Sequence, residues 1–199
     1  MIKFLNYLFK SKKNTFKDEA NFKQLTSNNG MQQLFKLFSS YSEKAELRFV
    51  GGCLRKLISH ERVDDIDLST NLIPNIVVEI LKKNKINYYE TGIKYGTITA
   101  VIDKKSFEIT TLRKDITTDG RHAQVEYTQD WLKDASRRDF TINAIYSDLD
   151  GNLFDPYNGK GDLKIGLIKF IGDPAIRIKE DYLRILRYIR FFLEYSKNQ

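Results

Sequence analysis

The sequence predicts an α+β fold that leads into a helical segment. Short β-rich runs alternate with helical stretches up to residue 112, whereas the final pattern, from Ile178 to Tyr195, is helical alone. The chain has 199 residues, of which 41% are apolar, so it has room for one good core and a small appendage. We expect a mixed β-sheet with helices around that core, followed by the start of an all-helical region.

The first part of the chain predicts helices that alternate with short strands. Apolar residues recur with helical periodicity between Glu19 and Tyr41, except at a Ser-Asn-Asn-Gly turn, Ser27–Gly30. Two β-rich runs, Gly96–Ile102 and Ser106–Leu112, are joined by Asp-Lys-Lys, which predicts a hairpin. The other elements expected in this part are a strand at 47–50, a helix at 53–59, a strand at 65–68 and a helix at 73–83.

The second part predicts a loop and then a helix. Arg113–Asp134 is polar and contains an Asp-Gly pair, so we expect a long mobile loop, a kind of segment that is usually functional. A helix or helix start is expected at Arg137–Tyr146, and a glycine-rich connection at Gly151–Ile171. Ile178–Tyr195 has the periodicity of an amphipathic helix. The residues expected on its inward face are Leu183, Leu186, Ile189 and Leu193.

Composition limits the kinds of partner and metal site. The net charge is +7 and the isoelectric point is near 9.3, which fits an anionic partner, although an AT-rich genome would favour the same composition. Cys53 is the one cysteine, and His60 and His122 are the two histidines. These are too few for a disulfide framework or a zinc cluster. Any metal must therefore be held by carboxylates.

No apolar run approaches the roughly twenty residues that cross a membrane, so we expect a soluble, cytoplasmic protein without membrane contact. The opening Met1–Phe16 is basic and aromatic without acidic residues, as some transit peptides are, but it lacks their arginines. We interpret it as a frayed terminal segment.

Residues 49–68 combine a strand, a glycine pair, a helix and an acidic strand. Gly51 and Gly52 allow a tight turn and a close approach of the backbone to a ligand, and the helix start behind them presents N–H groups to phosphate. Arg55 falls in the first helical turn, where its guanidinium can reach that phosphate. This run predicts a nucleotide site.

Asp65 and Asp67 stand at the end of this run. On a strand, both carboxylates face one side and can hold hard cations such as magnesium, as two-metal phosphoryl transfer requires. An acidic pair alone favours an ordinary exposed surface. However, GG-x-x-R followed ten residues later by D-x-D resembles motif A of tRNA nucleotidyltransferases and bacterial poly(A) polymerases, within the DNA polymerase beta-like superfamily. Those families usually have aspartate where Lys56 stands.

The resemblance continues along the chain in the family's order. Residues 91–97 (TGIKYGT) resemble a stretch in which histidine usually occupies the position of Tyr95. Residues 107–113 (FEITTLR) resemble the strand that delivers a third catalytic carboxylate, so Glu108 is the candidate for it. Without the family match, a solvent-facing glutamate would be the favoured interpretation.

Residues 137–144 (RRDFTINA) match motif B of the same families. The resemblance implies that Arg138 and Asp139 select ribose, with the carboxylate accepting a hydrogen bond from the 2′-hydroxyl. It also places Asn143 in the nucleotide site. A helix start capped by Asp139 is the alternative, and the two roles are compatible.

The last motif, EDYLR at residues 180–184, is similar to motif D of the class II enzymes. On a helix, Asp181 and Arg184 would be neighbours, and their alternative role is a surface ion pair worth about 0.2–0.5 kcal/mol. Adenine and cytosine present an amino donor beside a ring-nitrogen acceptor, whereas guanine and uracil present a carbonyl beside an N–H. A carboxylate beside an arginine would therefore pair with A or C and leave buried groups unpaired with G or U. By resemblance, Arg187 and Arg190 extend this face toward the phosphates.

The chain is identified as a member of the class II tRNA nucleotidyltransferase (CCA-adding enzyme) and bacterial poly(A) polymerase family, and it resembles the head domain. This implies an amino-terminal extension at 1–30, the nucleotidyltransferase head at 31–150, and a connector with the first neck helix at 151–199, with body and tail absent. The implied activity is template-independent addition of C and/or A to the 3′ end of tRNA, from CTP and ATP with Mg²⁺.

Alternative interpretations stay open. Bacterial poly(A) polymerases tend to carry a basic segment after motif A, which this chain lacks, so the CCA interpretation is preferred over a poly(A) polymerase head. Enzymes that add only CC tend to have a shorter loop before motif B, whereas residues 113–134 have full length. A further alternative is a truncated head that binds nucleotide without independent activity, or that is completed by a separately encoded helical carboxy-terminal half.

Overall fold

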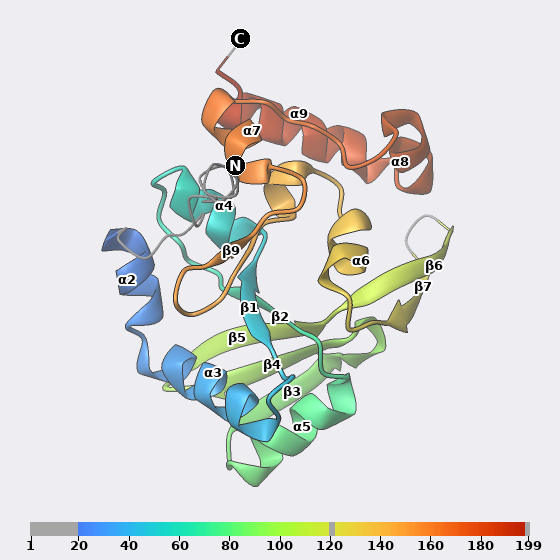
Figure 1. Ribbon diagram of the computed structural model, residues 1–199. Helices are drawn as coiled ribbons and strands as arrows, with labels where there is room; N and C mark the ends of the chain where they lie inside the picture. The colour runs from blue at the N-terminus through green and yellow to red at the C-terminus, as the bar shows by residue number, and fades with distance from the viewer. Residues whose placement is uncertain (1–19, 120–121, 198–199) are drawn as a thin grey trace, which may run out of the picture.

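The computed structural model describes residues 20–119 and 122–197, and its centre is a seven-stranded sheet (Figure 1). The strand order is β3-β4-β5-β2-β1-β8-β9, in which β2 and β5 are parallel and all other neighbours are antiparallel. The predicted α+β fold with a mixed sheet is thereby confirmed. The strands are β1 (Leu47–Val50), β2 (Asp67–Thr70), β3 (Asn87–Gly92), β4 (Thr97–Ile102), β5 (Lys105–Thr111), β8 (Tyr146–Ser147) and β9 (Leu153–Phe154).

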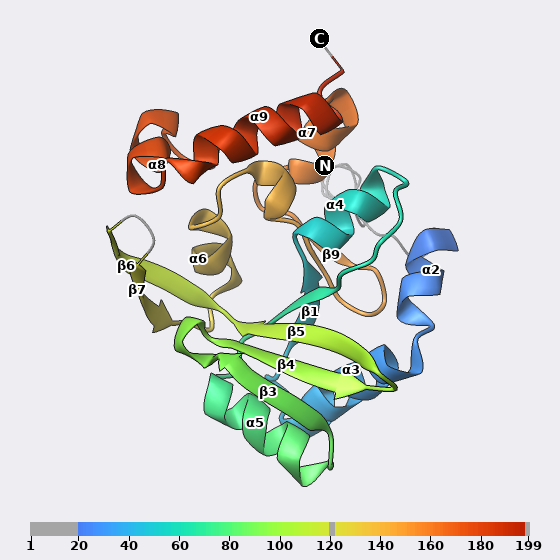
Figure 2. The ribbon, with the colours of Figure 1, turned by 180° about the vertical axis from the view of Figure 1, so that it is seen from behind.

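Helices lie at both ends of the molecule around this sheet (Figures 1 and 2). α3 and α5 pack below it, whereas α4 and α7 to α9 gather above it. No helix in the described ranges is both long and apolar enough to cross a membrane. The helices are α2 (Ala20–Thr26), α3 (Asn29–Tyr41), α4 (Gly52–Ile58), α5 (Pro74–Lys83), α6 (Trp131–Ser136), α7 (Gly159–Ile165), α8 (Pro174–Glu180) and α9 (Leu183–Tyr195), with 3₁₀ turns η1 (Ile93–Tyr95) and η2 (Thr141–Asn143).

The main core lies between the sheet and helices α3 and α5. In β4 every second residue is buried, namely Ile98, Ala100 and Ile102. Leu34 and Phe38 of α3 are fully buried in the same cluster. This alternation is the pattern expected of a strand with one face on the core.

α2 belongs to the same core through its buried residues Phe22 and Leu25. This part of the predicted extension is therefore packed on the head. The predicted break before α3 is confirmed, because the Asn28 side chain caps α3 by accepting a hydrogen bond from the Met31 N–H at 3.2 Å. The opening segment that we interpreted as frayed lies outside the described residues.

Other predicted elements of the first part are also confirmed. The strand at 47–50 and the helices near 53–59 and 73–83 are present as β1, α4 and α5. The β4–β5 hairpin turns at Asp103-Lys104, where both residues have positive φ, 51° and 62°. A two-residue turn of this kind matches the twist of its strands.

The acidic strand begins two residues later than predicted. β2 starts at Asp67, and Asp65 precedes it in a segment without regular structure. The neighbouring Asp64 forms ion pairs with Lys56 at 3.6 Å and Arg62 at 2.8 Å. The prediction that both aspartates share one strand face was therefore wrong, because only Asp67 lies in the strand, where it is paired with Glu108 of β5.

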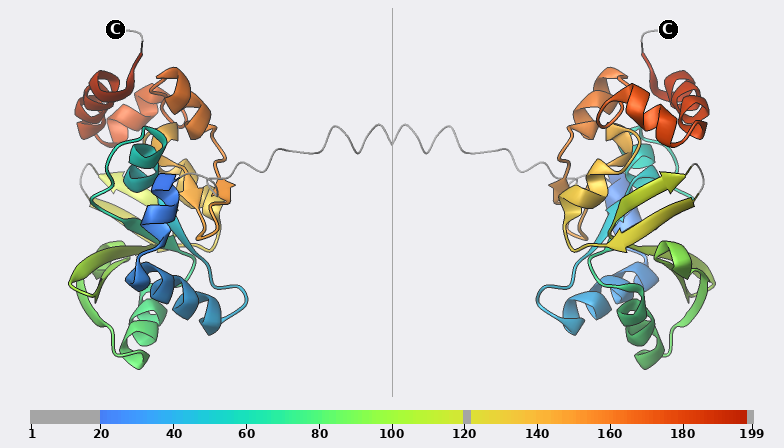
Figure 3. Two further views of the ribbon diagram at one scale, coloured as in Figure 1. Left: turned by 90° about the vertical axis from the view of Figure 1, so that its left-hand side faces the viewer. Right: turned by 90° about the vertical axis from the view of Figure 1, so that its right-hand side faces the viewer.

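The predicted loop at Arg113–Asp134 is mostly structured. It contains a two-stranded hairpin of β6 (Arg113–Asp119) and β7 (His122–Tyr127), followed by α6 (Figure 3). Lys114 and Glu126 are paired across the strands at 3.0 Å, and both side chains are about half exposed. The sequence of this segment is polar, so it was interpreted as a loop.

The stretch from 137 to 171 also differs from the prediction. The expected helix at Arg137–Tyr146 is only the short turn η2, and the expected connection contains β9 and α7. Thr141 explains this arrangement, because its N–H donates to the Lys169 carbonyl and its hydroxyl donates to Asp162 in α7. Gly159 packs so closely that a Cβ there would lie 2.1 Å from the Thr141 carbonyl oxygen. Long-range bonds to a later segment thus replace the helix.

The final helix was predicted with the wrong face inward. It is broken at Asp181-Tyr182 into α8 and α9, and the residues predicted to be inward are exposed. The buried residues of α9 are Arg184 and Phe191, of which Phe191 packs on Phe140. Aromatic packing against the head therefore outweighs the burial of aliphatic side chains. The exposed fractions are 45% for Leu183, 65% for Leu186, 49% for Ile189 and 63% for Leu193.

Candidate active site

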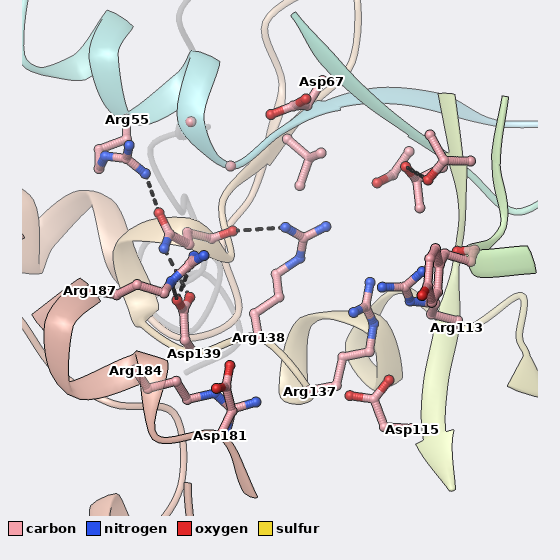
Figure 4. A pocket seen from close by; sticks show the side chains of 18 of the residues that line it. Arg55, Asp67, Arg113, Asp115, Arg137, Arg138, Asp139, Asp181, Arg184 and Arg187 are labelled. Atoms are coloured by element: carbon pink, nitrogen blue, oxygen red, sulfur yellow. Dashed lines mark hydrogen bonds and ion pairs between the residues drawn. The ribbon is translucent and has the colours of Figure 1, made fainter. Parts of the chain in front are cut away.

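A polar cleft of about 680 Å³ separates the sheet from α8 and α9 (Figure 4). Seven arginines and four aspartates line it, which suits a strongly anionic ligand. All ten residues that the sequence assigned to nucleotide binding line this cleft, and so does Asp67. The ten are Gly51, Gly52, Arg55, Arg138, Asp139, Asn143, Asp181, Arg184, Arg187 and Arg190.

The glycine pair forms the turn between β1 and α4. Gly51 has φ of +67°, a conformation that side-chain-bearing residues rarely adopt. Its N–H donates to the Ile145 carbonyl at 3.2 Å, which fixes the turn beside η2. At Gly52, a Cβ would lie 3.8 Å from the Asp67 carboxylate. The turn therefore brings the start of α4 close to Asp67.

Arg55 is held inside the wall of the cleft. Its guanidinium donates to the Asn143 side-chain oxygen and lies over the Phe191 ring, 4.5 Å from the centroid. The side chain is thus fixed by η2 and α9. Lys56, the departure from the family pattern, forms its ion pair with Asp64 instead. Arg55 is therefore positioned by Asn143 and Phe191 rather than by an acidic residue in its own helix.

A chain of hydrogen bonds links Arg55 through Asn143 and Asp139 to Arg187 (Figure 4). The Asp139 carboxylate accepts from the Phe140 N–H at 2.8 Å, from the Asn143 amide at 2.9 Å, and from two nitrogens of Arg187 at 2.7 Å each. These four donors occupy the acceptor capacity of a carboxylate. A ribose hydroxyl can bind Asp139 only by replacing one of them.

Asp134 is a buried hub that sequence reasoning missed. Its carboxylate accepts hydrogen bonds from the side chains of Arg137 and Arg138, from the Tyr146 hydroxyl at 2.7 Å, and from the Arg113 N–H at 3.2 Å. Burial alone would raise the pKa of this acid, but the charges of the two arginines and the hydroxyl bond outweigh it and lower the pKa to about 2. Asp134 therefore stays ionised and fixes the arginines of motif B. Its spacing of three and four residues from them was the available signal.

Asp67 and Glu108 are direct neighbours on the parallel strands β2 and β5. Burial raises the pKa of Asp67, and the charges of Glu108 and Asp65 raise it further, so negative charge is concentrated here. Asp65 lines a separate, adjacent cavity and Glu108 lies outside the cleft lining. Within residues 20–119 and 122–197, no three acidic, histidine or cysteine side chains converge as a metal site. Glu108, the predicted third carboxylate, is thus adjacent to Asp67. However, Asp65, Asp67 and Glu108 do not converge on one point as metal ligands would.

The corner between α8 and α9 holds the pair from motif D. Asp181 has extended backbone and accepts a hydrogen bond from the Leu183 N–H at 2.9 Å, while Arg184 lies in α9. The prediction that both lie on one helix was wrong, although both line the cleft (Figure 4). The ion-pair partner of Arg184 is Glu180, at 2.6 Å. Sequence reasoning missed this role of Glu180.

Known proteins resemble the chain in both sequence and fold. Residues 47–169 match the family model described as "Poly A polymerase head domain". The mouse protein named "CCA tRNA nucleotidyltransferase 1, mitochondrial" is 48% identical over 164 residues, which cover 82% of this chain and 37% of the relative. This chain therefore spans well under half the length of that protein.

Two solved structures show the likeness of fold. The Bacillus stearothermophilus CCA-adding enzyme in complex with CTP has a TM-score of 0.74 and 27% identity, over 89% of this chain and 41% of that one. A tRNA nucleotidyltransferase complexed with a primer tRNA and an incoming ATP analog has a TM-score of 0.63 and 26% identity, over 79% and 44%. The sequence, the fold and the cleft agree, and we conclude that the chain belongs to the poly(A) polymerase head-domain family.

Proposed function

We propose that this chain is the head of a nucleotidyltransferase that adds C and A to the 3′ end of tRNA, using CTP and ATP. The observation that carries the proposal is the cleft, which combines an arginine-rich wall with the corner of Asp181 and Arg184. The names of the similar proteins support it, since they include CTP, a primer tRNA and an ATP analog as bound molecules. We place the protein in the cytoplasm, although the mouse relative is named as mitochondrial.

The base is selected at the corner between α8 and α9. Arg184 uses Nη1 for Glu180 and for the Arg177 carbonyl, and its Nε and Nη2 have no protein partner in the described ranges. Asp181 has one oxygen bound to the Leu183 N–H and a second available. An arginine donor beside a carboxylate acceptor complements the ring nitrogen and amino group of cytosine or adenine. Uracil and guanine would face it with unpaired groups.

The sugar and phosphates face the rest of the arginine wall. Arg187 has a side chain that is 49% exposed, so it can turn from Asp139 toward a triphosphate. That movement frees one side of the Asp139 carboxylate for the ribose 2′-hydroxyl. Arg138, held by Asp134, and the more exposed Arg190 complete the anionic contacts.

The acidic residues fit a magnesium site by their chemistry. Asp67 and Glu108 supply hard oxygen donors on adjacent strands, and Asp65 is close enough for its charge to raise the Asp67 pKa. We propose that Asp65 and Asp67 hold Mg²⁺ and that Glu108 is the third catalytic acid. Bound magnesium would supply charge stabilisation to a phosphoryl transfer. The buried residues that follow Asp67 in β2 fix its position beside the glycine turn.

Nucleotide selection tests the proposal. With magnesium present, we expect CTP and ATP to bind at least about tenfold more tightly than UTP and GTP, because an unpaired buried polar group costs about 1–3 kcal/mol. Asp181→Ala and Arg184→Ala should remove most of that difference. Lys179→Ala, an exposed change in α8, is the matched control. Equal calorimetric affinities of the unaltered chain for all four nucleotides would refute this base-reading role.

A second expectation concerns tRNA. The apolar side chains exposed along α9 indicate that this helix packs on further polypeptide, either in a longer form of the chain or in a separately encoded helical partner. Orienting a tRNA needs many fixed phosphate contacts, whereas a net charge of +7 supplies loose attraction. The 199-residue chain should therefore bind tRNA weakly and with strong salt dependence, and transfer slowly. Titration of tRNA at several salt concentrations, with single-turnover assays, checks this; rapid specific transfer would contradict it.

One alternative activity has an observation in its favour, which is the family description as a poly(A) polymerase head. A poly(A) polymerase would accept ATP without CTP. Asp181 and Arg184 complement both bases, which favours addition of both. A chain that binds ATP but excludes CTP would support the alternative.

A further inference from the structure

Arg177 joins α8 to the head through a largely buried side chain. Arg177 has a side chain that is only 12% exposed, and its Nη2 donates to the backbone carbonyls of Arg137 and Arg138, the latter at 2.9 Å. No residue of α8 is buried, and Ile176 in the same helix is 59% exposed. Apolar packing therefore contributes little to the position of α8, whereas Arg177 joins it directly to the backbone of motif B.

The same arginine reaches the base-reading corner. Its Nη1 donates to Oε2 of Glu180 at 2.6 Å, and that oxygen also accepts from Nη1 of Arg184 at 2.6 Å. Arg184 in turn donates to the backbone carbonyl of Arg177 at 2.7 Å. Arg177, Glu180 and Arg184 thus form a closed set of contacts, which we name the corner clamp. One end of the clamp is the motif B backbone, and the other is the arginine that faces the base.

We propose that Arg177 is a specificity-determining positioning residue, which fixes the base-reading corner relative to the arginines that bind sugar and phosphate. The proposal rests on the proposed function, because it assigns Arg184 to the base and Arg138 to the other end of the nucleotide. A base is read only when Asp181 and Arg184 meet its edge while the triphosphate is in place. The corner clamp provides that fixed separation, because one planar guanidinium bonds to both parts at once.

The environment of Arg177 indicates more than a contribution to stability. Burial lowers its pKa, the nearby charge of Arg184 lowers it further, and its Nε has no hydrogen-bond partner among the described residues. A buried charge with incomplete partners is an inefficient way to stabilise a fold. Its geometry, with two adjacent carbonyls on one side and Glu180 on the other, is suited to orientation.

The test compares Arg177→Lys and Arg177→Met with Lys179→Ala, which changes an exposed basic residue of the same helix. Lysine keeps the charge but cannot bridge the two carbonyls and Glu180 as a planar fork. For each variant we would measure the affinities for CTP, ATP, UTP and GTP by calorimetry with magnesium, and the free energy of unfolding in urea. We expect the preference for CTP and ATP to fall by about tenfold, while affinity for UTP and GTP stays nearly constant. The control should keep the full preference.

A double-mutant comparison separates orientation from a general loss of structure. If Arg177 acts through Arg184, Arg177→Lys should have no further effect on the preference once Arg184→Ala is present. An equal loss of affinity for all four nucleotides, or an unchanged preference with only lower stability, would overturn the proposal. If Arg184→Ala itself leaves the preference unchanged, the proposed base reading fails. A preference that depends on Arg184 but not on Arg177 would overturn the positioning role alone.

Discussion

Asp67→Ala is expected to abolish nucleotide transfer while leaving the fold intact. The carboxylate stands at the start of β2, beside Glu108 and the glycine turn, and no apolar contact is lost with it. Metal-assisted charge stabilisation contributes several kcal/mol to barrier lowering, so we expect a loss of about 1,000-fold or more. Single-turnover incorporation of labelled CTP into tRNA that lacks its CCA end would measure this loss.

The neighbouring aspartates provide the comparison. Asp65→Ala should also abolish transfer if Asp65 holds metal, even though it lies outside the strand. Asp64→Ala is the matched control, because Asp64 is about half exposed and makes only surface ion pairs. Circular dichroism and urea unfolding should show folded protein in all three variants. Activity retained by Asp67→Ala at the same magnesium concentration would contradict the metal assignment.

Asp134→Asn is expected to destabilise the protein by about 3 kcal/mol near neutral pH and to weaken nucleotide binding. The substitution keeps the shape but leaves Arg137 and Arg138 without their buried counter-ion, and breaking such a pair is strongly destabilising. Arg138 would also lose the support that aims it into the cleft. Urea unfolding and CTP calorimetry would measure the two effects. Asp150→Asn, in an exposed turn, is the control.

Asp134 should also make the stability of the fold depend on pH, with less stability in acid. The folded pKa of Asp134 is lowered to about 2 from the ordinary aspartate value of 3.8, so ionised Asp134 stabilises the fold at all pH values above about 4. That contribution, about 2 kcal/mol, is lost as pH falls from about 4 to about 2. The stability difference between the unaltered chain and Asp134→Asn should shrink over this range. A constant difference down to pH of about 2 would show that the charge of Asp134 is not what stabilises it.

Much of the site could be predicted because short-range spacing fixes it. Gly51 and Gly52 must end β1 and open α4, and Asp67 follows on the adjacent strand, so local sequence brings them together. The RRDFTINA string likewise places Arg138 just before one short turn and Asn143 at the end of that turn. All of these residues line the cleft in the structure.

The remaining features depend on contacts between distant segments. α9 is amphipathic, and its aliphatic side chains suggested an inward face, but Phe191 packs on Phe140 instead and Arg184 turns inward to Glu180. No periodicity in the sequence shows which of two possible faces meets the head. The hydrogen bonds from Arg177 to the Arg137 and Arg138 carbonyls join residues about forty positions apart, so the sequence pattern could not predict them either.

The β6–β7 hairpin could not be predicted for a different reason. It is a ribbon outside the seven-stranded sheet, and its charged pair Lys114–Glu126 faces solvent. The polar sequence of this segment therefore indicated a loop, whereas backbone hydrogen bonds between its two halves form strands. Asp134, just after it, was overlooked because its spacing from Arg137 and Arg138 also fits a surface ion pair, and only the folded structure shows that it is buried against Tyr146.

Under the proposed function, side chains of this protein, rather than a nucleic-acid template, choose the added nucleotide. The most direct measurement supplies the chain, at high concentration, with tRNA ending before CCA, magnesium and all four nucleotides, and then sequences the extended 3′ ends. We expect slow extension with C and A only, and loss of this restriction in Arg184→Ala. Extension with U or G as readily as with C and A, or with A alone, would contradict it.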